Sequence, residues 1–347
     1  KTVEVCDRCG DRLETLIVTP ILKAGYSPNW NASWNRQYVK LENVKEGLHY
    51  DDVYVGKTGL GSVWLFHEGA RADTLGTNLY TEAQLKLLAT VMQQRSDWCA
   101  SNGKTFYFLI TPNKDSVYPE YLPSGTALAG NRRIDQVVNY LRSNTTVKVI
   151  DVRGALASAK AARPNESLYY PLDSHWNDNG GYAAYEAVLN VIRKDYPNAV
   201  LHARNEYQIE MYDSYFKDNA YYMGLYDRMS TQGPVFTLKS GMIGKCISAE
   251  GLLGGQFDNA YRDGMFSDGT LEARFECRYV NTPSVYVIND SFFIAMTRFF
   301  RDSFSKFSRH WTNEFSVSSI QKENPDIVIY QCVEGSLNSA FSTGALN

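Results

Sequence analysis

Two apolar stretches of the sequence decide its fold. They are Thr105–Ile110 (TFYFLI), which runs into Thr111–Asn113 (TPN), and Ser284–Ile288 (SVYVI), which runs into Asn289–Ser291 (NDS). Neither stretch alternates between apolar and polar residues, as a strand with one face in water would. A short apolar run that ends in turn-forming residues is typical of a strand buried on both faces. The two stretches therefore predict interior strands of a largely parallel sheet.

Further strands and helices alternate along the chain on either side of these two runs. Apolar residues at helical spacing predict the helices, and the first helix opens with a capping-box pair, Thr81 and Gln84. The predicted helices are Thr81–Asn102, Arg132–Arg142, Asn177–Lys194 and Phe292–Phe307, and the other predicted strands are Asp52–Gly56, Ser62–Phe66, Val147–Asp151 and Asp326–Cys332. This alternation predicts a three-layer α/β domain with a mostly parallel sheet.

The alternation also divides the chain. Residues 51–200 and 281–347 carry the α/β pattern. Residues 201–280 interrupt it with a stretch that is rich in Tyr, Gly and Asp and has no strong period, so we expect a large irregular insertion, or cap, over the α/β body. Its tyrosines, including Tyr221, Tyr222 and Tyr226, either line one wall of a substrate groove or fill the space beneath the cap. Residues 1–50 are expected to be an irregular lead-in that packs on the main domain.

Composition and cysteine content exclude several classes of protein. The 347 residues are 44% hydrophobic and 21% charged, with a net charge of −3. A weakly negative chain argues against nucleic acid as the main partner. Cys6 and Cys9 form a CxxC pair, but no second close pair completes a zinc site, so no metal is expected. A local disulfide and two free thiols both remain open for this pair.

The turn Asn289–Ser291 is the sharpest candidate site. Ligands of open α/β sheets bind beyond the carboxyl ends of the strands, and here a predicted helix follows the strand at once. A serine in such a turn projects its hydroxyl from the sheet edge, with its backbone N–H directed at a developing oxyanion. The structural alternative is that Asp290 or Ser291 only caps the helix.

His175 is the candidate base for Ser291. Among the five histidines it stands out because Asp173 precedes it by two residues, within Asp173–Trp176 (DSHW). In a loop or extended segment these two side chains lie on the same side, so the carboxylate can accept from one ring nitrogen while the other nitrogen faces a hydroxyl. The sequence contains no GxSxG, Walker A, GxGxxG or HExxH string, so no nucleotide or other cofactor is expected.

Together these motifs resemble the SGNH-hydrolase-like proteins of the alginate O-acetyltransferase type, the DHHW group. Asp173–Trp176 and Asn289–Phe292 are similar to the two catalytic blocks of that family. Further similar segments follow in the same order: Val55–Lys57 with Trp64–Phe66, Thr111–Glu120, Asn177–Ala184 and Asn324–Val328. The chain departs from the family at Asn289, where Gly is usual, and at Gly335, where Arg is usual. The first departure predicts a different turn before the serine.

The resemblance implies an extracytoplasmic O-acetyltransferase. Such an enzyme would move acetyl groups onto an exopolysaccharide or cell-surface polysaccharide through an acetyl-serine at Ser291. Asn113, Lys114 and Asn289 are further candidates at the oxyanion or substrate site. Trp176 is either the floor of a sugar site or a core residue. An acetylesterase with the same triad and a non-catalytic polysaccharide-binding scaffold remain alternatives.

The same resemblance implies partners and a location. The expected partners are the polysaccharide acceptor and a membrane-bound O-acetyltransferase that supplies acetyl groups. The chain has no Gly-rich phosphate cradle and no basic stripe for acetyl-CoA, which agrees with a donor delivered at a membrane. Because the sequence opens at Lys1 rather than Met, an upstream signal or N-terminal membrane anchor is expected, with the protein in the periplasm or at the cell surface.

Overall fold

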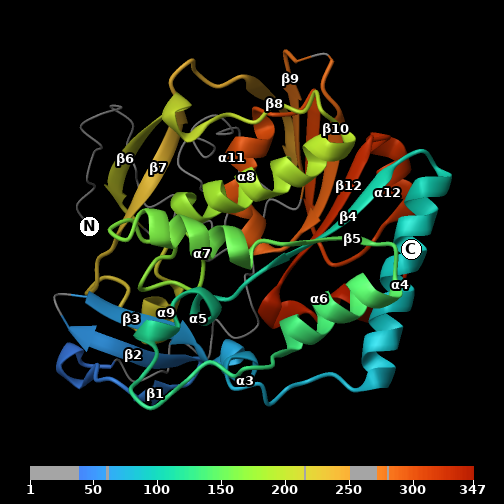
Figure 1. The fold of residues 1–347 in the computed structure, drawn as a ribbon. Helices are drawn as coiled ribbons and strands as arrows, with labels where there is room; N and C mark the ends of the chain where they lie inside the picture. The colour runs from blue at the N-terminus through green and yellow to red at the C-terminus, as the bar shows by residue number, and fades with distance from the viewer. Residues whose placement is uncertain (1–38, 60–61, 215, 251–271, 280) are drawn as a thin grey trace.

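A central sheet with helices on both faces forms the body of the protein (Figure 1). The computed structural model describes residues 39–59, 62–214, 216–250, 272–279 and 281–347. Within these residues the sheet has seven strands in the order β5-β4-β12-β10-β11-β9-β8. The first five strands of this order are parallel to one another, whereas β9 pairs antiparallel with both β11 and β8. The expected three-layer α/β fold with a mostly parallel sheet is confirmed.

The strands fall into three sheets. The central sheet contains β4 (Thr105–Thr111), β5 (Lys148–Asp151), β8 (Gly244–Glu250), β9 (Glu272–Cys277), β10 (Ser284–Asn289), β11 (Lys306–Trp311) and β12 (Ile327–Val333). A small antiparallel sheet contains β1 (His49–Tyr50), β2 (Val53–Gly59) and β3 (Ser62–His67). A two-stranded sheet contains β6 (Tyr207–Asp213) and β7 (Gln232–Leu238).

Helices cover the central sheet on both sides because its strands present apolar side chains to both. Along β4, Tyr107 and Leu109 pack on one side, and Phe106 and Phe108 on the other. The first side is covered by α7 (Arg153–Ala162), α8 (Asp178–Asp195) and α11 (Ile294–Arg301). The second is covered by α4 (Glu82–Ser101), α6 (Arg133–Asn144), α12 (Val317–Glu323) and α13 (Ser339–Ser342). The short helices are α3 (Arg71–Thr74), α5 (Lys114–Val117) and α9 (Asp218–Tyr222).

Most local predictions are confirmed, and one is wrong. Thr81 caps α4 in a capping box with Gln84. The helix expected over Phe292–Phe307 ends at Arg301, and β11 begins at Lys306. The hydroxyl of Ser303, just after α11, donates to the carbonyl of Phe299 (2.8 Å), and such a bond back to the helix favours a turn over further helix. Phe304 and Phe307, which extend the helical spacing, instead reach the core from the turn and from β11.

The stretch 201–280 contributes to more than one part of the molecule. It forms β6, β7 and α9, and it also supplies β8 and β9 to the central sheet. The division of the chain into domains stays a prediction. Most of the lead-in, with Cys6 and Cys9, lies outside the described residues. None of the described helices is both long and apolar enough to cross a lipid bilayer.

Helices α8 and α11 pack closely because Gly181, in the first turn of α8, has no side chain. A Cβ on Gly181 would lie 2.9 Å from both the Cβ and the carbonyl oxygen of Ala295 in α11. A Cβ on Gly180 would lie 2.4 Å from the carbonyl oxygen of Leu168. Since α8 follows His175 and α11 follows Ser291, this contact sets the distance between the two candidate catalytic segments.

The Gly181→Ala variant tests this contact. The added methyl group has no room, so we expect overpacking to lower the free energy of unfolding by about 1–3 kcal/mol. Urea denaturation measures the loss. Gly154→Ala, at a helical position in α7 where a Cβ meets nothing within 4 Å, is the matched control and should raise stability by about 0.5 kcal/mol. Equal effects of the two substitutions would show that the close approach of α8 and α11 does not matter.

Candidate active site

Ser291 lies directly beyond the carboxyl end of β10. It opens a short 3-10 turn, Ser291–Phe293, that leads into α11. Asp290 holds this turn, because its carboxylate accepts hydrogen bonds from the N–H groups of Phe292 (2.9 Å) and Val333 (2.6 Å). The capping role considered for this turn therefore belongs to Asp290, and the hydroxyl of Ser291 is available to another partner.

His175 reaches Ser291 from the segment between α7 and α8. Tyr169 and Trp176 form an isolated β-bridge that closes this segment into a loop. The Nε1 of Trp176 donates to the carbonyl oxygen of Phe292 at 2.7 Å, which ties the histidine loop to the serine turn. Trp176 is only 2% exposed, so it is a core residue that also lines the pocket described below.

The three residues chosen from the sequence meet in one hydrogen-bonded series. Nε2 of His175 lies 2.8 Å from Oγ of Ser291, and Nδ1 lies 2.7 Å from Oδ1 of Asp173. The same Oδ1 also accepts the backbone N–H of His175 at 2.9 Å. When Nδ1 donates to the carboxylate, Nε2 is left to accept the serine proton.

Carboxylates dominate the electrostatics around the histidine. Burial alone lowers the pKa of His175, but the charge and hydrogen bond of Asp173, with the charges of Asp218 and Asp290, raise it to about 9. Burial opposes ionisation of Asp173, yet the charge and hydrogen bonds of His175 keep the pKa of Asp173 below its ordinary value. The buried acid is therefore ionised at neutral pH, as an orienting carboxylate must be.

Lys114 lies beneath this loop and does not point at Ser291. Its ammonium is buried and donates to four backbone carbonyls: those of Leu65, Tyr170, Pro171 and Asp173. Burial lowers the pKa of Lys114 to about 8, against the raising effect of the carboxylates of Asp218 and Asp173. These contacts hold the loop that carries Asp173. Among the described residues, Lys114 makes no hydrogen bond to Ser291.

Asn113 and Asn289 also lie at the sheet edge, but away from the pocket beside Ser291. Asn113 is tied to the end of β12, since its N–H donates to Glu334 (3.1 Å) and its Oδ1 accepts from Gly335 (3.2 Å). Its buried Nδ2 has no hydrogen-bond partner among the described residues, so its role as an oxyanion donor stays a prediction. Asn289 is fully buried, and its Nδ2 donates to the carbonyl of Asp290 at 2.7 Å.

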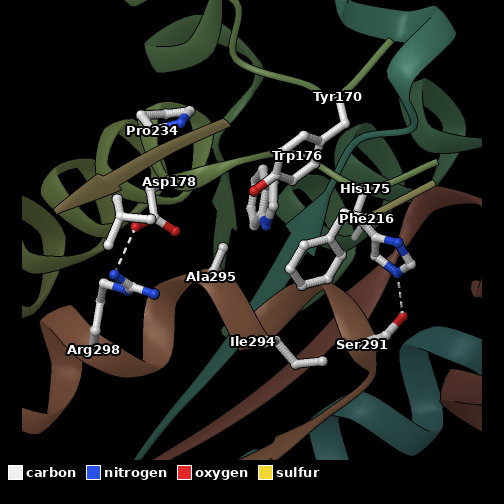
Figure 2. A pocket seen from close by; sticks show the side chains of 11 residues that line it. Tyr170, His175, Trp176, Asp178, Phe216, Pro234, Ser291, Ile294, Ala295 and Arg298 are labelled. Carbon is white, nitrogen blue, oxygen red and sulfur yellow. Dashed lines mark hydrogen bonds and ion pairs between the residues drawn. The ribbon is translucent and has the colours of Figure 1, made fainter. Parts of the chain in front are cut away.

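A narrow pocket opens beside Ser291 and His175. Figure 2 shows these two residues at one end and an ion pair, Asp178 with Arg298 (2.9 Å), at the other. The other lining residues are mostly apolar or aromatic: Tyr170, Trp176, Phe216, Pro234, Val235, Ile294 and Ala295. Such a lining, with few polar groups, is typical of a small-molecule site.

The stretch 201–280 supplies one wall of this pocket through residues that the sequence did not single out. Phe216, Pro234 and Val235 line the pocket, whereas the expected Tyr221, Tyr222 and Tyr226 do not. These positions could not be predicted from the sequence, because the stretch has no period that marks an inward face. Arg298 could have been inferred, since it lies two helical turns after Ser291 and therefore on the same side.

The fold and the arrangement of the site define a class of protein: an SGNH hydrolase-like α/β domain. Residues 53–225, which include Asp173 and His175, match the family model described as the SGNH hydrolase-like domain of the acetyltransferase AlgX. These residues therefore belong to that acetyltransferase family, and the family expected from the motifs is confirmed. None of the curated proteins matches the chain in sequence.

Solved structures share the fold over most of the chain. A DHHW family protein from Eubacterium siraeum is 16% identical with a TM-score of 0.64, and the match covers 87% of this chain and 99% of that protein. PatB1 from Bacillus cereus, solved with a sulfonyl adduct, is 17% identical with a TM-score of 0.61, and the match covers 81% of this chain and 97% of PatB1. At these identities the likeness concerns the fold alone.

The Lys114→Met variant tests the role of the buried ammonium. Methionine fills a similar volume but leaves four buried carbonyls without their donor. Because a buried polar group without a partner costs about 1–3 kcal/mol, we expect the free energy of unfolding to fall by about 3–5 kcal/mol in all. Chemical denaturation measures the change. The control is Lys148→Met, which breaks a surface pair with Asp195 and should cost less than about 1 kcal/mol. A Lys114 variant as stable as this control would show that the loop is held by other contacts.

Proposed function

We propose that this protein is an O-acetyltransferase that transfers acetyl groups to a polysaccharide through an acetyl-serine at Ser291. The observation that carries the proposal is the hydrogen-bonded series from Ser291 through His175 to Asp173 at the carboxyl edge of the sheet. It occurs in a chain whose residues 53–225 belong to an acetyltransferase family. A serine, a base and an orienting acid in hydrogen-bond contact are the parts that acyl transfer requires.

In the first step, Oγ of Ser291 attacks the carbonyl carbon of the acetyl donor while Nε2 of His175 takes the hydroxyl proton. The backbone N–H of Ser291 is the proposed donor to the tetrahedral oxyanion. The oxyanion then collapses, the bond to the leaving group breaks, and His175 returns its proton to that group. Asp173 stabilises the imidazolium during this step without taking the proton.

In the second step, a sugar hydroxyl attacks the acetyl-serine. His175 accepts the hydroxyl proton, the ester bond to Ser291 breaks, and the proton returns to Oγ. If water takes the place of the sugar, the same residues perform ester hydrolysis. Transferase and acetylesterase therefore differ in the acceptor, and only an assay that offers both acceptors separates them.

The first test is a pre-steady-state assay with 4-nitrophenyl acetate. We expect a burst of 4-nitrophenol, because acetylation of Ser291 releases the phenol before the acetyl-enzyme turns over. Ser291→Ala should abolish the burst and lower the rate by about 10⁴–10⁶-fold, the loss typical of a removed nucleophile. Ser318→Ala, at an exposed serine of α12, is the control and should keep the burst. A burst retained in Ser291→Ala would remove the basis of the mechanism.

A second test asks whether a sugar or water accepts the acetyl group from the acetyl-enzyme. Sugar oligomers are added during turnover, and mass spectrometry measures acetylated sugar against free acetate. Acetylated oligomers that depend on Ser291 support the transferase. Acetate as the sole product across neutral and charged oligomers would favour the acetylesterase. A protein that binds oligomers but forms no acetyl-enzyme would be the polysaccharide-binding scaffold.

We also propose that the acetyl groups arrive from a membrane-bound O-acetyltransferase outside the cytoplasm, in the periplasm or at the cell surface, rather than from soluble acetyl-CoA. The pocket beside Ser291 supports this, because its lining contains one Arg or Lys side chain, Arg298, and that side chain is paired with Asp178. Calorimetry with acetyl-CoA should therefore detect no tight binding. Micromolar affinity, about −8 kcal/mol, would overturn this route and place acetyl-CoA itself as the donor.

A further inference from the structure

A second carboxylate faces the candidate base. Oδ2 of Asp218 lies 3.8 Å from Nδ1 of His175, the same nitrogen that Asp173 holds at 2.7 Å. Asp218 is the first residue of α9, within the irregular stretch 201–280. It lies too far from Nδ1 for a hydrogen bond, so its influence on the imidazole is that of a nearby charge.

Asp218 is held in this position by bonds to the triad segment itself. Its Oδ1 accepts the N–H of Ser174 at 2.7 Å, and its Oδ2 accepts the hydroxyl of Ser174. Its own backbone N–H donates to Oδ2 of Asp173 at 2.8 Å. The side chain of Asp218 thus fixes the residue between Asp173 and His175, and its backbone fixes the carboxylate that orients the imidazole.

We propose that Asp218 is a positioning residue that holds the Asp173–His175 turn and sets the basicity of His175 through its charge. This inference rests on the proposed acetyl transfer. The inference gives the stretch 201–280 a second role: besides lining the pocket, it supplies a charge that acts on the candidate base.

The groups that face His175 leave a negative surplus around the imidazole. Asp173 comes from its own loop, Asp218 from α9, and Asp290 from the turn after β10. The opposing positive charge is Lys114 of α5, whose ammonium bonds to the carbonyl of Asp173. His67 of β3 also faces the site, and burial lowers the pKa of His67, which favours its neutral form.

Asp218 carries its charge over the pH range in which the enzyme would work. Burial and the charge of Asp173 raise the pKa of Asp218 to about 6, so it is ionised at neutral pH and above. An ionised Asp218 stabilises the imidazolium that forms as Ser291 loses its proton. It also raises the pH at which His175 becomes a free base, so the rate of acetylation should rise with pH up to about 9.

Asp218→Asn separates charge from structure, because the amide keeps the size and one acceptor oxygen for Ser174. We measure the rate of enzyme acetylation by 4-nitrophenyl acetate from pH 6 to pH 10. The apparent pKa of the rise should fall by about 1–3 units, the effect of a charge at this distance, and the high-pH plateau should fall too. A lower plateau with an unchanged apparent pKa would mean that Asp218 is only structural and would overturn the proposal.

Two variants control this measurement. Asp227→Asn removes the same charge from an exposed position of the same stretch and should leave the apparent pKa unchanged. Asp218→Glu keeps the carboxylate and should retain a raised pKa. If Asp218→Asn fails to fold, Asp218→Ser serves as the neutral variant. The proposal is then contradicted if the apparent pKa of acetylation is the same in Asp218→Ser and in Asp218→Glu.

A titration that needs no activity separates this proposal from the proposed function. In Ser291→Ala, the imidazole of His175 is followed by NMR, and its resonance is assigned with His175→Gln. The pKa of His175 should lie well above that of a free histidine and should fall when Asp218 becomes Asn. If the pKa of His175 behaves in this way but the unmodified protein forms no acetyl-enzyme, the proposed function is contradicted and the role of Asp218 is not. If the pKa of His175 does not change in Asp218→Asn, the role of Asp218 is contradicted and the proposed function is not.

Discussion

The buried ammonium of Lys114 is the interaction on which the geometry of the candidate site depends. It joins β3 to the Tyr170–Asp173 segment by donating to a carbonyl of β3 and to three carbonyls of that segment. An irregular loop cannot satisfy its carbonyls with regular secondary structure, and unpaired buried carbonyls are costly. One cation with three donors, set against the rings of Trp64 and Phe66, fixes a loop that would otherwise have several conformations. Asp173 is the last residue of that segment, so its direction follows from this anchor.

The distance from His175 to Ser291 is set by two further contacts between elements far apart in the sequence. The indole N–H of Trp176 bonds to the serine turn, and Gly181 lets α8 lie directly on α11. The serine side is fixed separately, because Asp290 ties its turn to β12. Rigid elements thus support both halves of the pair, which favours a precise nucleophile–base distance before any substrate binds.

Much of this arrangement could be predicted from the sequence because its determinants are local. Apolar runs define β4 and β10, and the Asp-x-His spacing places two side chains on one side of a loop. The helix expected through Phe307 was wrong because Phe304 and Phe307 satisfy helical spacing from a turn and a strand. Lys114 was selected for its place at a strand end, and its local sequence does not reveal that four distant carbonyls surround it. Asp218 could not be found at all, since its partners lie 44 and 45 residues away.

The two sources of the site have different physical roles. The turn after β10 supplies Ser291, and the loop between α7 and α8 supplies His175 and Asp173. As a candidate nucleophile, base and orienting acid, these three residues must be placed within about 0.5 Å of the productive geometry. The stretch 201–280 supplies the second carboxylate and the wall of Phe216, Pro234 and Val235. A wall acts by shape and a charge acts over several ångströms, but Asp218 is also hydrogen-bonded to Ser174 and Asp173, so its placement is tied to that of the triad segment. The stretch 201–280 is therefore suited to adjust the basicity of the histidine and the shape of the pocket while it also holds the Asp173–His175 turn.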